Sequence, residues 1–237
     1  ASDVYKRQTY KHLRSHQHSL YIVMGTAHQY SRRLFHLTKK HFETPLGRLE
    51  TEQSFVDKLS GLFGIERSFE DEFLHKQEHS LELQLPFLKR IKSTNNHDQS
   101  YKIAPILVGS FHEMLAKQKL PEEFEEYATF SGALTECLIE YLNKGSKVCF
   151  IAGVDMAHVG RAFGDPGSLT KEKLDIINQQ DRVYLECIKN QDKTALFAHM
   201  AQDQNERKVC GFPTIYTMID LFDRLNIKYQ SYEFDYK

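Results

Sequence analysis

The sequence predicts a single α/β domain with a mixed, largely parallel sheet and helices on both faces. Residues 19–24 and 148–154 are continuous apolar runs, as expected for strands that are covered on both sides. Segments with strand and helix patterns alternate along the 237 residues, which indicates crossover connections between parallel strands. No linker, repeat or low-complexity tract divides the chain, so one core is expected.

The individual elements follow from local patterns of apolar, glycine and proline residues. Strand-like segments are residues 19–24, 34–46, 101–108, 148–154 and 227–234. Helix-like segments are residues 52–63, 80–91, 121–142, 169–188, 193–200 and 212–225. Gly64 is expected to cap the first of these helices, whereas Pro86 should kink or shift the second. Pro121 and the glutamates that follow it favour a helix start at that point.

Charge and cysteine usage restrict the partners and the compartment. Lys and Arg number 31 against 32 Asp and Glu, so nothing favours a nucleic acid or an anionic membrane as partner. None of the four cysteines forms a CxxC pair, which favours a reducing cytoplasm. No apolar run approaches the ~20 residues that span a bilayer, and the first residues are too polar for a signal peptide. We therefore expect a cytoplasmic protein.

Four short polar signatures adjoin these elements and indicate a functional site. They are Gly-Thr-Ala-His at 25–28, Glu-His-Ser-Leu-Glu at 78–82, Asp-Met-Ala-His at 155–158 and Cys-Gly-Phe-Pro at 210–213. Ligands of open α/β sheets bind beyond the carboxyl ends of the strands, and His28 and His158 directly follow the two buried strands. We therefore expect His28, His158 and Cys210 to converge.

Each candidate residue also has a purely structural explanation. His28 could be a loop histidine bonded to the backbone, and Cys210 could be an inert buried thiol, although a helix start favours the metal-binding thiolate. Asp155 lies three residues before His158 and is placed to fix the orientation of that ring. A helix start alone explains an acidic residue at Glu78.

Together, His28, His79, His158 and Cys210 suit a metal site with few protein ligands and open coordination positions. Non-haem Fe(II) and catalytic zinc use this arrangement. The sequence contains no HExxH, paired CxxC, GxGxxG, P-loop or GxSxG motif. The common hydrolase and nucleotide-binding signatures therefore do not account for the four residues.

The order of the motifs resembles the Memo-like family, whose microbial members are called AmmeMemoRadiSam system protein B. The resemblance covers nearly all of the chain from about residue 21. Its most specific parts are Glu-His-Ser-Leu-Glu-Leu-Gln-Leu-Pro-Phe at 78–87 and Asp-Met-Ala-His-Val-Gly at 155–160. Further matching segments lie at 25–28, 42–47, 106–109, 163–165 and 210–211.

The resemblance implies a LigB-like fold, similar to that of class III extradiol dioxygenases, in which a non-haem iron activates oxygen. In Memo proteins the corresponding pocket binds iron or copper through two histidines and one cysteine. By this resemblance His28 and Cys210 are metal ligands, Asp155 and His158 are polar pocket residues, and His79 is a further wall residue. We expect His158, Asp155 and His79 to have catalytic roles. Iron is the expected cofactor, with copper or zinc as alternatives.

One departure from the family pattern affects the metal site. The first metal histidine of the family lies in a Pro-His-Ala-Gly-Tyr motif, and this sequence has none; His12, His16 and His18 do not replace it. We therefore expect weak metal binding and a domain that is incomplete at both ends. Residues 1–8, which lack an initiator Met, are treated as a non-native artefact, so the domain is assigned to residues 9–237.

Three functions remain open at this point. The first is a metal-dependent redox role, with His158 as a proton donor or acceptor near the metal. The second is a non-catalytic scaffold that binds a peptide or a small molecule in the inherited pocket. The third is a Cys-His hydrolase with Cys210 as nucleophile and His158 as base, which requires the two side chains within hydrogen-bond reach.

Overall fold

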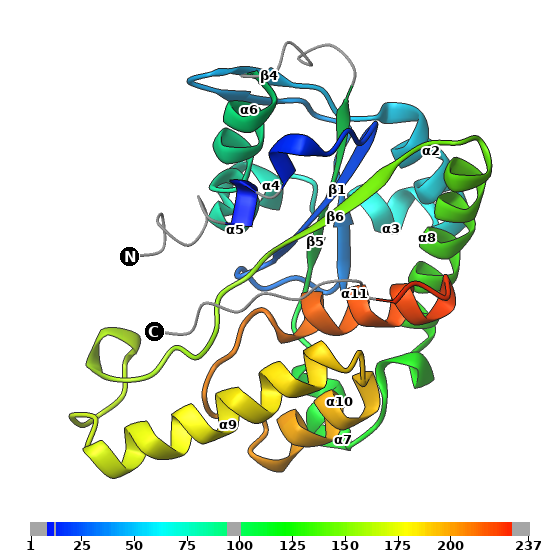
Figure 1. Cartoon of the computed structure of the whole chain (residues 1–237). Helices are drawn as coiled ribbons and strands as arrows, with labels where there is room; N and C mark the ends of the chain where they lie inside the picture. Colours follow the sequence, from blue (N-terminus) through cyan, green and yellow to red (C-terminus); the bar gives the residue numbers. More distant parts are fainter. Residues whose placement is uncertain (1–8, 12, 94–100, 229–237) are drawn as a thin grey trace.

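A four-stranded sheet forms the centre of the molecule (Figure 1). The computed structural model describes residues 9–11, 13–93 and 101–228. In spatial order, the strands are β2 (Phe35–Leu37), β5 (Lys102–Val108), β1 (Leu20–Thr26) and β6 (Val148–Gly153). β1 pairs in parallel with both β5 and β6, whereas β2 pairs antiparallel with β5. The sheet is mixed and largely parallel, as predicted.

Helices cover both faces of this sheet (Figure 1). The helices of the described residues are α2 (Gln53–Phe63), α3 (Ile65–Phe69), α4 (Leu74–Gln77), α5 (His79–Glu82), α6 (Leu85–Ser93), α7 (His112–Lys117), α8 (Glu125–Asn143), α9 (Lys171–Lys189), α10 (Lys193–Gln202) and α11 (Phe212–Arg224). Short 3-10 turns are η1 (Leu13–Ser15), η2 (Pro121–Glu123) and η3 (Arg161–Phe163). In Figure 1, α4, α5 and α6 lie on one side of the strands and α2, α8 and α11 on the other. This arrangement confirms the predicted single α/β domain.

Alternate side chains of β1 supply the two halves of the core. Ile22 and Met24 belong to the larger apolar cluster beneath α2, α8 and α11, whereas Tyr21 and Val23 belong to the cluster beneath α5 and α6. All four side chains are completely buried. Because successive residues of a strand point to opposite faces, a strand covered on both faces must be apolar throughout.

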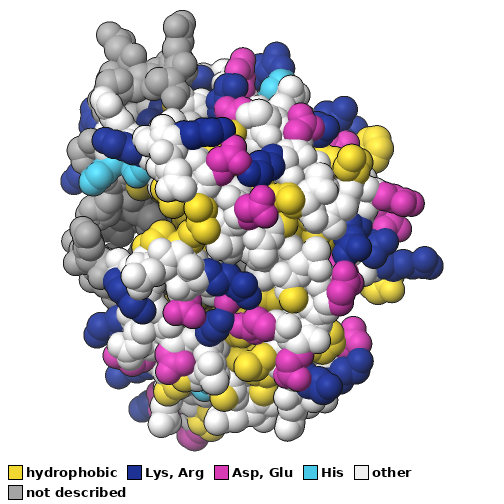
Figure 2. All heavy atoms as spheres, turned by 90° about the vertical axis from the view of Figure 1, so that its right-hand side faces the viewer, with side chains coloured by type: hydrophobic (Ala, Val, Ile, Leu, Met, Phe, Trp, Pro, Cys, Tyr) yellow, Lys and Arg dark blue, Asp and Glu magenta, His cyan; other side chains and the backbone are white. Residues whose placement is uncertain are grey.

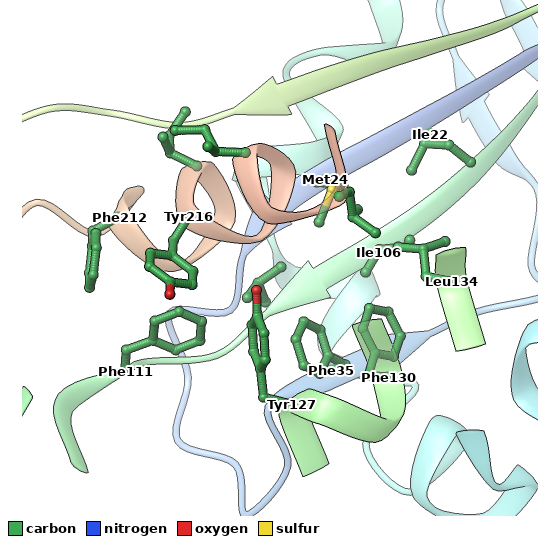
Figure 3. Packing of buried hydrophobic residues seen from close by; sticks show 14 of the residues in the cluster. Ile22, Met24, Phe35, Ile106, Phe111, Tyr127, Phe130, Leu134, Phe212 and Tyr216 are labelled. Atoms are coloured by element: carbon green, nitrogen blue, oxygen red, sulfur yellow. The ribbon is translucent and has the colours of Figure 1, made fainter. Parts of the chain in front are cut away.

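Stacked aromatic rings tie the sheet to the helices of the larger cluster (Figure 3). The ring of Phe35 in β2 lies parallel to that of Phe130 in α8, with their centroids 3.7 Å apart. Tyr127 of α8 and Tyr216 of α11 meet edge to face beside them. Such contacts add roughly 0.5–1.5 kcal/mol per pair to the burial of apolar area. They hold α11, which follows Cys210, firmly against the sheet.

Two predicted elements are divided in the structure. The expected helix at 80–91 is broken into α5 and α6, with Pro86 as the second residue of α6. Proline lacks the N–H that would continue the hydrogen bonding of α5, but it fits the first turn of a new helix. The expected extended segment at 34–46 contains β2 and, separately, β3 (Phe42–Thr44), which forms a hairpin with β4 (Gly47–Leu49).

The remaining expectations are confirmed or lie outside the described residues. α2 ends at Gly64 with a φ of 119°, a conformation that glycine adopts without strain. The helix predicted at 121–142 starts as η2 and continues as α8. Most of the strand predicted at 227–234 and all of residues 1–8 lie outside the described part of the chain. Among the described residues, no helix combines the length and apolarity that crossing a bilayer requires.

Charged side chains of both signs are mixed over the face of the molecule that carries α2 and α8. Figure 2 shows Lys and Arg interspersed with Asp and Glu over this face. Several of these charges form ion pairs, including Lys144 with Glu140 at 2.6 Å. This distribution matches the nearly balanced composition of the chain.

Candidate functional site

The candidate site lies at the carboxyl ends of β1 and β6, where α5 meets the segment before α11. A cavity of about 30 Å³ opens there, which is more than the ~10–15 Å³ that one water molecule needs. Its lining residues come from four separate parts of the chain: Thr26, His28, His79, Ser80, Leu83, Gln84, Gly153, Val154, Asp155 and Cys210. The position agrees with the rule for open α/β sheets that placed the site after the buried strands.

Glycine residues let the elements approach closely enough to form this cavity. A Cβ on Gly25 of β1 would lie 2.5 Å from Oγ of Ser80, and a Cβ on Gly153 of β6 would collide with the carbonyl oxygen of Ser80. A Cβ on Gly211 would likewise collide with the side chain of Val154. Only the absence of side chains therefore allows α5 and the segment before α11 to sit directly on the strand ends.

Hydrogen bonds from side chains fix these elements to the end of β1. Ser80 Oγ donates to the carbonyl oxygen of Thr26 at 3.0 Å. Thr26 Oγ1 donates to the carbonyl oxygen of Cys210 at 3.1 Å, and Thr214 Oγ1 donates to that of Gly25 at 3.3 Å. Cys210 therefore has a defined position although it belongs to no helix or strand.

The buried carboxylate of Glu78 is bonded to both His28 and His79. Nδ1 of His28 lies 2.8 Å from Oε1 of Glu78, and the backbone N–H of His28 donates to Oε2 at 2.9 Å. Nδ1 of His79 lies 3.3 Å from the same Oε1. The two imidazole rings stack with their centroids 4.8 Å apart. Among the described residues, these three form a group whose possible ligand atoms lie within 4.8 Å of one another.

His28 carries a positive charge at neutral pH in this arrangement. Hydrogen bonds to the Cys210 side chain and to Glu78 raise the pKa of His28 to about 10, against the opposing effect of burial. Burial would raise the pKa of Glu78, but the hydrogen bonds that it accepts from His28 and Ser80 lower it to about 2. The His28 ring thus lies between a carboxylate and a thiol, both of which it contacts.

His158 stands beside the cavity rather than in its lining. Its Nδ1 lies 3.0 Å from the carbonyl oxygen of Lys208, and its ring meets that of Phe163 edge to face at 4.8 Å. Its Nε2 lies 3.9 Å from Oδ2 of Asp155, which is beyond hydrogen-bond distance. The carbonyl group of Lys208 therefore holds the ring, the task that the sequence assigned to Asp155, and Asp155 itself lines the cavity.

The structure thus brings together most of the residues that the sequence singled out. His28, His79, Asp155 and Cys210 line one cavity, and His158 lies outside its lining, with Nε2 3.9 Å from Oδ2 of Asp155. Sequence reasoning assigned no site role to the cavity residues Thr26, Ser80 and Gln84 or to Glu78 behind them. Glu78 does accept the N–H of Ser80 at the start of α5, as a helix-start residue should, but it contacts His28 as well.

Comparisons with known proteins agree with the motif pattern. A family model described as Memo-like protein matches residues 2–236. A MEMO1 family protein from Aquifex aeolicus is 24% identical over 228 residues, which are 96% of this chain and 53% of that protein. A MEMO1 family protein from Methanosarcina barkeri is 27% identical over 206 residues, 86% of this chain and 63% of that protein. The chain therefore spans less than two thirds of the length of either relative.

Proposed function

The chain belongs to the Memo-like family, and on that premise we propose that it has a metal-dependent redox role in which His28 and Cys210 hold the metal. The observation that carries the proposal is the shared cavity: His28 and Cys210 line it together, and the Cys210 side chain raises the pKa of His28. An imidazole nitrogen and a thiolate sulfur are ligands that suit iron, copper and zinc. Iron is the metal that we propose first.

The donor set fits such an ion on structural grounds. Nδ1 of His28 is engaged by a carboxylate, an arrangement that metal-binding histidines commonly show because it orients the ring toward the metal. The volume of the cavity allows an ion with a bound water. A redox metal with open coordination positions supplies oxygen activation or polarisation of a chelating substrate.

The surrounding side chains would bind the substrate and donate or accept protons. Asp155 and His79 line the cavity with side chains that are 62% and 57% exposed, so both reach solvent and substrate. Nε2 of His158 lies 3.9 Å from Asp155, so a proton can pass between His158 and a ligand at that carboxylate only after the side chains move closer or through a bridging water. A substrate larger than a few atoms must lie at the mouth, beside the half-exposed Leu83. A small molecule or a peptide side chain is the ligand that we expect.

Metal analysis combined with oxygen consumption tests this function. The chain is loaded with Fe²⁺ under anaerobic conditions, and oxygen uptake is then measured with a panel of catechols. His28→Ala and Cys210→Ser should lose both bound iron and oxygen uptake, because each removes a ligand. Cys149→Ser serves as the matched control, since that thiol lies in β6 and lines no part of the cavity. Oxygen uptake that both ligand variants retain would contradict the proposal.

The same experiment distinguishes the other two functions. Iron binding without oxygen uptake on any catechol would favour a scaffold that uses the pocket for recognition only. The hydrolase needs His158 as base for Cys210, but His158 is not in the lining of the cavity that contains Cys210, and its Nδ1 is bonded to the Lys208 carbonyl. The geometry therefore favours the metal site over the hydrolase.

A further inference from the structure

Glu78 makes more hydrogen bonds than a helix-start residue requires. One oxygen bonded to one backbone N–H is enough to cap a helix. Glu78 accepts that bond from Ser80, and it also accepts the backbone N–H of His28 and lies within 3.3 Å of Nδ1 of both His28 and His79. Glu78 is only 4% exposed, so its carboxylate is surrounded almost entirely by protein groups.

These contacts determine which part of the His28 ring faces the cavity. An ionised carboxylate only accepts hydrogen bonds, so the His28 nitrogen beside it must carry a proton. Nε2 on the opposite edge of the ring is then the nitrogen that remains for the cavity, which Cys210 also lines. A metal binds at that nitrogen by displacing its proton, and the nitrogen beside Glu78 does not compete for the metal.

The same carboxylate oxygen also positions the second ring. Oε1 of Glu78 is shared between Nδ1 of His28 and Nδ1 of His79, and the two rings lie within 21° of parallel. His79 is the first residue of α5, and its side chain is more than half exposed. Stacking on His28 and the contact with Glu78 therefore hold it at the wall of the cavity.

We propose that Glu78 is the positioning residue of this site: it orients His28 toward Cys210 and holds His79 alongside. The inference rests on the proposed function, in which His28 is a metal ligand. Glu78 itself lies behind the two rings and is absent from the cavity lining, so it acts through them rather than as a ligand. Because the loop after β1 and the start of α5 share this carboxylate, the relative position of the two motifs depends on it.

The test measures Co²⁺ binding to the full chain and its Glu78→Gln variant. Loss of an orienting carboxylate is expected to weaken Co²⁺ binding by about 10–100-fold. The exchangeable ring N–H signal of His28 in the NMR spectrum of the Co²⁺ form should also exchange faster with water. Glu82→Gln is the matched control, because Glu82 is an exposed glutamate in the same short helix. Glu78→Asp, which keeps the charge with a shorter reach, should lie between the two.

A metal-free measurement separates this inference from the proposed function. The crystal structure of metal-free Glu78→Ala is expected to show the His28 and His79 rings turned out of their stacked arrangement. Unchanged rings together with wild-type Co²⁺ affinity in Glu78→Gln would overturn the role of Glu78, whatever His28 binds. A second outcome would also overturn the positioning role. If Glu78→Gln and His79→Asn both lost Co²⁺ binding completely while Cys210→Ser bound Co²⁺ normally, Glu78 would itself be a metal ligand. Equal Co²⁺ binding by His28→Ala and wild type would instead refute the proposed function alone.

Discussion

Gly153 and Ser80 are in contact so close that no methyl group fits between them. A Cβ on Gly153 would collide with the Ser80 carbonyl oxygen and would lie 2.8 Å from Cγ of Gln84. The glycine at the end of β6 therefore sets how near α5 comes to the sheet. Because Glu78 and His79 immediately precede Ser80, this contact also determines how far these two side chains lie from the ends of the strands.

Gly153→Ala should lower the free energy of unfolding by about 1–3 kcal/mol, because backbone atoms must shift to make room. Gly132→Ala is the matched control. Gly132 lies in α8, where an added methyl group would meet nothing within 4 Å, so alanine there should stabilise by about 0.5–1 kcal/mol. Urea unfolding of both variants measures the two effects. Equal stability of Gly153→Ala and wild type would show that α5 is not held in place by this contact.

His158→Ala should change stability by less than about 1 kcal/mol while abolishing turnover or ligand binding. The ring has one contact to a backbone carbonyl and one edge-to-face contact with the half-exposed Phe163, and it belongs to neither apolar cluster. Thermal unfolding and oxygen uptake are measured on the same preparation. His112→Ala, which removes an exposed histidine at the start of α7, should alter neither quantity. Full activity in a destabilised His158→Ala protein would assign that histidine a purely structural role.

Stability should fall as the pH is lowered from about 6.5 toward 4, because His75 is buried as the neutral form. Burial lowers the pKa of His75 to about 4 from its ordinary value of 6.5. Between these two values the unfolded chain binds a proton that the folded chain does not, so protonation favours unfolding. One such histidine accounts for at most ~1.4 kcal/mol per pH unit. Burial also lowers the pKa of the neighbouring His36, which acts in the same direction.

His75→Gln isolates this contribution to the pH dependence. Glutamine can keep the hydrogen bond to the carbonyl oxygen of His36 but does not titrate. Urea midpoints between pH 7.5 and 5 should therefore decline less steeply in His75→Gln than in the wild type. Parallel declines would mean that other groups cause the acid sensitivity.

Iron or zinc is expected to leave this chain during dialysis against a mild chelator. The proposed site has two protein ligands, His28 and Cys210, whereas structural zinc sites use four. A metal must also displace a proton from His28, whose pKa is raised to about 10 by hydrogen bonds to Cys210 and Glu78. Retention should therefore increase as the pH rises from 7 to 9, as measured by elemental analysis. One full equivalent retained at pH 7 would require ligands beyond these two.

The sequence was sufficient for elements whose causes are local. The apolar runs that became β1 and β6 are recognisable because both faces of these strands are covered. Gly64 and Pro86 mark helix boundaries through their own backbone chemistry, and both act where they stand in the sequence. The placement of His28 and Cys210 at one cavity followed from the rule for strand ends and from the resemblance to the family.

Contacts between distant segments could not be predicted in the same way. Glu78 fits the local pattern of a helix start, and only the folded chain brings it to His28, 50 residues earlier. The group that holds His158 is the backbone carbonyl of Lys208. Every residue has a backbone carbonyl, so the sequence of side chains does not indicate which one will bond to His158. The break between α5 and α6 was foreseen at Pro86, but not that the short α5 would rest on two glycines.

The order in which the site can form during protein synthesis follows from the hydrogen bonds at the end of β1. Thr26 is bonded to Cys210 across 184 residues, and Thr214 to Gly25 across 189. A nascent chain that ends before residue 210 contains every strand of the described sheet, as well as His28 and Glu78, but no thiol for the cavity. Such a chain has His28 but lacks Cys210, the second ligand of the proposed metal site. In the proposed metal site, both ligands are therefore in place only after Cys210 has been synthesised and α11 has docked on the sheet.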